Sequence, residues 1–162
     1  MTMKTTIKIL EIVFLIFIFE GCKTEEISLN MLDEFPTTKY YSTDIIPEQY
    51  NHIYGIWKVT KTSGGFIGIG YEKDFDYLIL KKNGIFGIIR KDSLITYGKM
   101  TLLPDLDMNF PIGIHCKFDF EKSVNIELCS DSEKYIQLIN NDTLNLIAPC
   151  CDRYNIHFIR QK

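Results

Sequence analysis

The chain has 162 residues, enough for one domain with a modest core, and its 46% hydrophobic and 24% charged residues are the balance of a globular protein. Aromatic residues make up 13%, with nine Tyr and eleven Phe, which favours strands or a lined cavity. The net charge is -3 and no block of Lys and Arg stands out, so we expect no nucleic-acid partner.

Residues 1–21 have the pattern of a secretion signal. Lys4 and Lys8 precede an uncharged run, Ile12–Phe19, which is shorter than the roughly 20 residues that cross a bilayer. The alternative is a buried amphipathic helix of the mature domain, and Glu11 inside the apolar region favours that interpretation.

The signal ends in "FEGCK", which resembles the bacterial lipoprotein signal: Gly21 and Cys22 match, and Phe19 stands where Leu is usual. The resemblance implies that Cys22 becomes the lipid-modified first residue, whose acyl chains hold the protein on a membrane. The acidic pair Glu25 and Glu26 resembles a signal that sends lipoproteins outward. We therefore expect the bacterial cell envelope, with the anchor in the outer membrane.

Residues 22–49 lack clear periodicity and hold Pro36 and Pro47 with many Thr, Asp and Glu. This composition indicates a tether between lipid and domain. An ordered arm packed on the domain is the alternative that the sequence leaves open.

Residues 50–162 contain up to nine short apolar or alternating segments separated by turn residues. Asn83-Gly84 joins two apolar runs and predicts a type I′ hairpin turn, in which both central residues have positive φ. The predicted fold is all-β: an antiparallel up-and-down meander closed into a barrel of about eight strands, because closure removes the edges. One segment has to lie outside an eight-stranded barrel. The expected strands are "YGIWKVTK", "DYLILKK", "IFGIIR", "SLITYGKMTLL", "GIHCKFDF", "VNIELC", "KYIQLI", "TLNLIA" and "YNIHFIR", with "GIHCKFDF" the candidate for exclusion.

The stretch "PEQYNHIYGIWKV" resembles the first motif of the lipocalin family, a short helical turn followed by Gly-x-Trp, and Arg160 matches the family's closing Arg. The order of the Trp57 strand, Gly64-Gly65, Asn83-Gly84, "DTLNL" and "YNIHFIR" is similar to small lipocalin-like lipoproteins of Gram-negative bacteria. The resemblance implies a calycin-type barrel over about Pro47–Lys162.

Strand parity supports a contact between the first and the last strand of this barrel. Trp57 lies on the apolar face of its strand, and Arg160 is in phase with Ile156 and Phe158. We expect Arg160 to lie over the Trp57 ring where the first and last strands close the barrel, as a structural pair. The alternative is that Arg160 frays into solvent.

The remaining cysteines are Cys116, Cys129, Cys150 and Cys151. The turns "CSDSE" and "APCCD" are expected at the same end of the barrel, beside "TSGGFIGIGY", which makes that end the candidate mouth. The sequence therefore predicts a disulfide from Cys129 to Cys150 or Cys151, because adjacent cysteines rarely bond to each other.

No pattern supports metal, cofactor or catalytic chemistry. His115 and His157 fall on polar faces, and the cysteines lack ligand spacing, so we expect no metal site. "GGFIGIG" lacks the Lys-Ser/Thr and the helix of a phosphate loop, and no G-x-S-x-G elbow occurs, so we expect neither a cofactor nor an enzyme.

Two functions stay open. In the first, a lipid-anchored barrel binds a small hydrophobic or amphipathic ligand in a cavity lined by inward side chains, namely Phe118, Phe120, Ile126 and Leu128. In the second, those side chains fill the interior, and the barrel is a scaffold or interaction protein. The sequence does not fix the oligomeric state.

Overall fold

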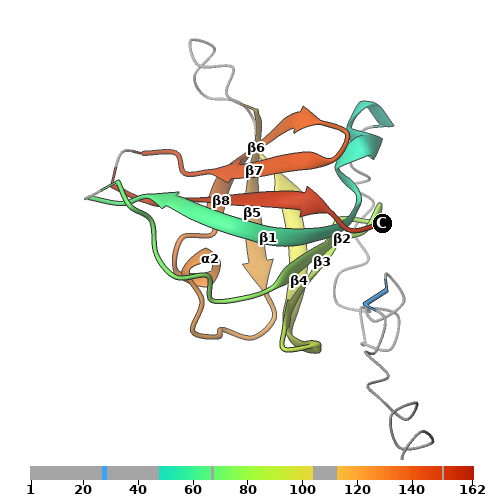
Figure 1. Cartoon of the computed structure of the whole chain (residues 1–162). Coiled ribbons are helices and arrows are strands. Elements are labelled where there is room, and N and C mark those ends of the chain that lie inside the picture. The colour runs from blue at the N-terminus through green and yellow to red at the C-terminus, as the bar shows by residue number, and fades with distance from the viewer. Residues whose placement is uncertain (1–26, 29–47, 67, 104–112, 151) are drawn as a thin grey trace, which may run out of the picture.

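The computed structural model describes residues 27–28, 48–66, 68–103, 113–150 and 152–162, which form one closed barrel of eight antiparallel strands (Figure 1). The 3-10 helix η3 (Glu48–Ile53) leads into the first strand. The strands follow in chain order: β1 (Gly55–Gly64), β2 (Tyr77–Leu80), β3 (Ile85–Arg90), β4 (Ser93–Leu102), β5 (Ile114–Phe120), β6 (Glu133–Asn140), β7 (Thr143–Ile147) and β8 (Tyr154–Arg160). The predicted meander is confirmed.

Closure is made by β1 and β8, which lie side by side in antiparallel register from Trp57↔Arg160 to Gly64↔Tyr154 (Figure 1). The register shifts between Val59 and Lys61, where an extra residue bends β1. Because each strand has a neighbour on both sides, the sheet has no free edge.

The connections gather at two opposite ends. One end, which we call the η3 end, carries η3, the turn between β2 and β3, and the turn between β6 and β7. The other, the α2 end, carries the 65–76 connection, the β3–β4 turn, the 121–132 connection with α2 (Glu127–Ser130), and the 148–153 turn. The turns that we expected at the candidate mouth are therefore together at the α2 end.

The segment outside the barrel is "VNIELC", not "GIHCKFDF". The latter is β5, whereas the expected strand over residues 124–129 is an irregular stretch followed by the one-turn helix α2. β5 and β6 already pair with each other, as in Ile114↔Ile136, so an added strand would find no free partner. The expected alternation at residues 124–128 still buries Ile126 and Leu128, but from a connection.

The Asn83-Gly84 hairpin forms, but its turn is not type I′. Gly84 has φ 78°, whereas Asn83 is not among the residues with positive φ, and the Gly84 N–H donates to Lys81 O at 3.0 Å. The two-residue turn with positive φ at both positions is Lys91-Asp92, at 51° and 58°. Lys91 is held there because its N–H donates to Asp76 Oδ2 at 2.8 Å.

The predicted signal (1–21), the lipidation candidate Cys22 and most of the predicted tether (22–49) lie outside the described residues. Ile27 is described, and it packs against apolar side chains on the outer face of the sheet. At this position the chain therefore contacts the barrel, as in the alternative of an ordered arm.

Candidate functional site

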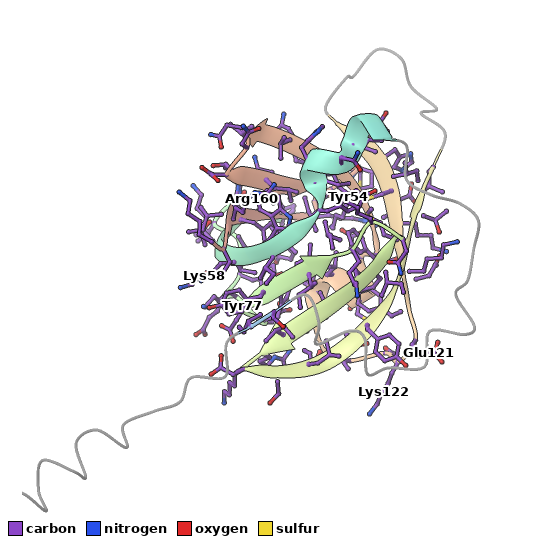
Figure 2. All side chains as sticks on the ribbon, turned by 90° about the vertical axis from the view of Figure 1, so that its right-hand side faces the viewer. Tyr54, Lys58, Tyr77, Glu121, Lys122 and Arg160 are labelled. Atoms are coloured by element: carbon purple, nitrogen blue, oxygen red, sulfur yellow. The ribbon has the colours of Figure 1, made fainter. Side chains whose placement is uncertain are left out.

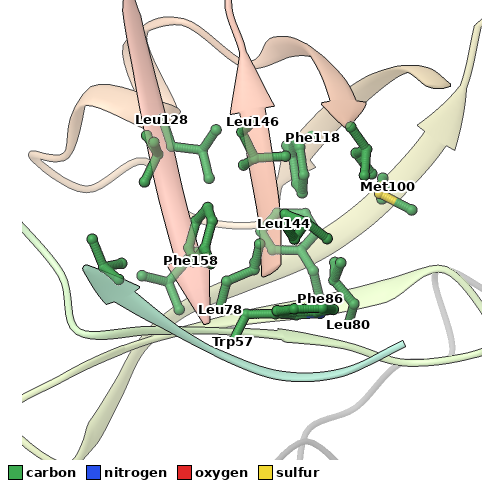
Figure 3. Packing of buried hydrophobic residues seen from close by; sticks show 14 of the residues in the cluster. Trp57, Leu78, Leu80, Phe86, Met100, Phe118, Leu128, Leu144, Leu146 and Phe158 are labelled. Carbon is green, nitrogen blue, oxygen red and sulfur yellow. The ribbon is translucent and has the colours of Figure 1, made fainter. Parts of the chain in front are cut away.

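The barrel interior is filled by large apolar side chains (Figure 3). Phe86 meets the rings of Phe118 and Phe120 edge-on, with centroids 5.0 and 4.9 Å apart, although β4 separates their strands. Phe75 and Phe158 lie 6.3 Å apart, from the segment before β2 and from β8. These contacts join segments that are separated by one strand in the barrel.

All four predicted cavity-lining residues belong to this core. Phe118, Ile126 and Leu128 are buried, and Phe120 is partly buried against the same cluster. Leu128 projects from α2 and has no exposed surface, so it closes the α2 end from the inside. The four side chains are therefore packed together with the core.

The η3 end is closed by Trp57 and Arg160. The guanidinium carbon of Arg160 lies 4.2 Å from the centroid of the Trp57 ring, and the indole Nε1 donates to Ile53 O at 2.8 Å. Arg160 Nη1 donates to Tyr54 O at 2.7 Å and Nη2 to His52 O at 2.6 Å, while Nε donates to Asn141 O at 2.7 Å. Figure 2 shows Arg160 and Tyr54 close to η3. The guanidinium thus joins η3, β1, β8 and the β6–β7 turn.

Gly55 makes room for this arrangement. A Cβ at this position would lie 2.5 Å from Arg160 Nη1, and the φ of 140° is one that other residues rarely adopt. The positive φ favours glycine at this position of the Gly-x-Trp motif, and the missing Cβ leaves room for the guanidinium beside it.

A buried charged cluster lies at the α2 end. The Lys134 side chain, only 1% exposed, pairs through Nζ with Asp131 Oδ2 and donates to Tyr154 O at 3.2 Å. Asp131 Oδ1 accepts from Arg153, on the 148–153 turn. Because an unpaired buried charge is costly, the cluster fixes how α2 and the 148–153 turn sit on the barrel. The sequence offers one signal for this cluster, since Lys134 is in phase with the inward Ile136 of β6, but we did not predict it.

The 65–76 connection is held against α2 by a second set of polar contacts. Asp74 Oδ2 accepts the Glu127 N–H at 2.6 Å, and Asp74 O accepts from Arg90 Nε at 2.5 Å. Tyr71 packs edge-on against Tyr154, with centroids 4.9 Å apart. Burial, followed by the nearby Asp74 and Glu127 carboxylates, raises the pKa of the Tyr71 hydroxyl. Tyr71 is thus a neutral packing residue.

A row of polar side chains crosses the outer face of β1, β8, β7 and β6. Ser63 Oγ lies 2.7 Å from His157 Nε2, His157 Nδ1 lies 2.9 Å from Asn145 Oδ1, and Asn145 Nδ2 donates to Gln137 Oε1 at 3.4 Å. Burial and the nearby Lys61 lower the pKa of His157, which favours the neutral ring.

The first three groups have the order of a nucleophile, a base and an orienting group. We interpret the row as a cross-strand polar ladder, because Gln137, Asn145 and His157 are in register on neighbouring strands and each has its partner within the row.

Cys116, Cys129 and Cys150 are free thiols in this structure, and Cys151 lies outside the described residues, so the predicted disulfide stays a prediction. Cys129 is on α2, not on a strand, and its sulfur contacts Ser123 Oγ at 3.8 Å. Burial raises the pKa of Cys116, so its thiol stays protonated despite the nearby Lys134.

Metal-binding groups are dispersed over the described parts of the chain, where no three His, Cys, Asp or Glu side chains gather as a metal site would require. His115 is buried, stacks on Tyr135 with centroids 4.6 Å apart and places Nε2 2.6 Å from Glu133 Oε1. Within the same described residues, no helix has the length and apolar character to cross a membrane.

A second apolar cluster covers the outside of the barrel over β1 to β4. Its buried members are Ile79, Ile85 and Ile89, and partly buried residues packed on them are Ile27, Ile56, Tyr77, Leu94 and Tyr97. The apolar runs "YLIL" and "IFGII" hold apolar residues at both parities, a signal that both faces of these strands are covered.

Comparison with known proteins gives one structural likeness. No protein-family model matches the chain, and no curated protein matches it. The crystal structure of a DUF4847 family protein from Bacteroides vulgatus is similar over 72% of this chain and 100% of that chain, with 14% sequence identity and a TM-score of 0.47. That likeness concerns the fold at most, and the resemblances to lipocalins and to lipoproteins stay predictions.

Proposed function

We propose that the protein is a lipid-anchored envelope lipoprotein whose filled barrel acts as a non-enzymatic scaffold or interaction module, without a small-molecule ligand inside. The observation that carries this proposal is that the inward side chains have almost no exposed surface: Phe86 is 0% and Phe118 1% exposed, and their rings pack edge-on. Leu128 at the α2 end adds to the same packing. A carrier needs an internal volume of about 300 Å³ or more, whereas here the inward side chains form one buried apolar cluster.

The membrane part of the proposal is supported by sequence: a basic and apolar leader followed by Gly21-Cys22. Radioactive palmitate fed to the producing cells should label the wild-type protein, and the Cys22→Ala variant should lose the label. Equal incorporation in both proteins would contradict the anchor.

The filled interior is tested by titration with a small apolar fluorescent probe. We expect no saturable binding to the wild-type protein, and stoichiometric binding to Phe118→Ala, because removal of a buried ring leaves an apolar cavity. The variant thus serves as the positive control. Non-denaturing mass spectrometry of protein from its own cells should give the mass without a ligand; a co-purifying apolar molecule would refute the scaffold and restore the carrier.

A further inference from the structure

The connection after β1 holds two large apolar side chains out into solvent. Phe66 is 92% exposed and Ile69 is 80% exposed, far above the other exposed apolar residues of the described chain. The connection that carries them follows Gly64 of β1 at the α2 end (Figure 1). Two such side chains in one short loop indicate a contact surface, because scattered single residues are the normal case.

The backbone of this loop is fixed by hydrogen bonds. The Gly65 N–H donates to Arg153 O at 3.0 Å, the Gly68 N–H to Gly65 O at 2.9 Å and the Gly70 N–H to Gly64 O at 3.0 Å. These glycines have φ between 73° and 92°, a range open to glycine, and the Tyr154 ring fills the space beneath Gly65. Gly65 and Gly70, which flank Phe66 and Ile69, are therefore tied to Arg153 and Gly64 at the end of the barrel.

The barrel interior does not need these side chains, since Leu128 and Ile126 already close the α2 end from within. Charges around the loop are mixed: Lys61, Lys73 and Arg153 are exposed, and so are Glu72 and Asp152. Two exposed apolar side chains surrounded by charges of both signs fit the apolar interior of a lipid bilayer better than a charged surface. Moving each side chain from water into such an interior raises the partition constant by about one to two orders of magnitude.

Affinity of this size is weak for a free protein but sufficient for one already held at a membrane, because tethering raises the effective concentration. Ile27 packs on the outer face of the barrel, and Cys22 lies five positions before it in the chain. Five extended residues span at most about 18 Å, so an anchor at Cys22 would hold the barrel close to the bilayer.

We propose that Phe66 and Ile69 insert into the surface of the bilayer and orient the α2 end of the barrel toward it. This inference rests on the lipid anchor of the proposed function. Since the contact is apolar, it needs no anionic lipid and persists at high salt.

The test uses the full chain with Cys22→Ala and an N-terminal histidine tag, bound to phosphatidylcholine vesicles that contain a nickel-chelating lipid. Tethering is then independent of lipidation, so failure of the anchor and failure of insertion are separate results. The reporter is Phe66→Trp, which places an indole at an exposed site. The natural Trp57 is buried and gives the baseline emission in the unsubstituted protein.

Brominated lipids should quench the added emission of Phe66→Trp at least twofold and shift it to the blue, and the effect should persist at 1 M salt. The matched control is Ile139→Trp, 54% exposed on β6 near the η3 end, which should stay unquenched. Equal quenching of both reporters would mean that the barrel lies on the surface without this orientation and would overturn the proposal. An unquenched Phe66→Trp would also overturn it and would make a protein partner the occupant of the loop.

Discussion

Removal of the Arg160 guanidinium should destabilise the closure of the barrel. In Arg160→Met, the aliphatic stem is retained, whereas the three hydrogen bonds to Tyr54 O, His52 O and Asn141 O and the contact with Trp57 are lost. A shielded hydrogen bond from a charged group is worth about 1.5–3 kcal/mol, and a cation–π contact about 0.5–1 kcal/mol. Only the bond to Tyr54 is partly buried, so the two others add little.

We therefore expect Arg160→Met to lower the free energy of unfolding by about 3 kcal/mol, measured by urea denaturation with far-UV circular dichroism. Trp57 fluorescence gives a second probe of the same transition. The matched control is Lys162→Met, which removes an exposed cation at the same terminus and should cost under about 0.5 kcal/mol. In a double-mutant cycle with Trp57→Phe, the coupling energy should be about 0.5–1 kcal/mol. A loss no larger than that of Lys162→Met would refute the reasoning.

Four further outcomes follow from the same structure. Asp131→Asn should lower the free energy of unfolding by about 3–5 kcal/mol, because it leaves the buried Lys134 ammonium without its charge partner. Lys134→Met should lower it much less. Thermal unfolding that ranks the two variants the other way would contradict the buried pair. Leu128→Ala should lower the free energy of unfolding by about 2–5 kcal/mol, because loss of this side chain from α2 creates a cavity at the α2 end of the barrel. A decrease under about 1 kcal/mol in urea denaturation would show that α2 is not part of the core. Burial raises the pKa of Asp76, but the Lys91 N–H and the Lys73 ammonium outweigh it and leave the pKa below 3.8. The stability that this carboxylate contributes is therefore complete above about pH 4 and is lost as the pH falls through the lower folded-state pKa, so the difference between wild type and Asp76→Asn should be constant from pH 7 to 5 and shrink below pH 4. A fluorophosphonate probe should label neither wild type nor Ser63→Ala; labelling that depends on Ser63 would turn the polar ladder into a catalytic site.

Much of the barrel could be predicted because alternation is a local property. The inward parity of Trp57 and Val59 on β1, and of Ile156 and Phe158 on β8, is visible in the sequence and agrees with their burial. The same parity led us to expect Arg160 beside Trp57, and the structure has the two groups 4.2 Å apart.

The α2 segment could not be predicted in this way. Val124, Ile126 and Leu128 alternate like a strand, but alternation only says which side chains are buried. A segment becomes a strand only if a neighbouring strand has an unpaired edge. β5 and β6 pair with each other, so the edges on which residues 124–129 could have paired were already occupied. The same change of backbone put Cys129 beside Ser123.

By itself, the sequence determined an antiparallel meander, its approximate strands and the phase of the side chains that face inward, because these depend on neighbours along the chain. Only the tertiary structure decided the rest: the solid interior, the buried Lys134–Asp131 pair, the apolar outer face with Ile27 and the exposed turn with Phe66 and Ile69. Each of these depends on which strands meet across the axis or which connections share an end, and that is fixed only when β1 pairs with β8.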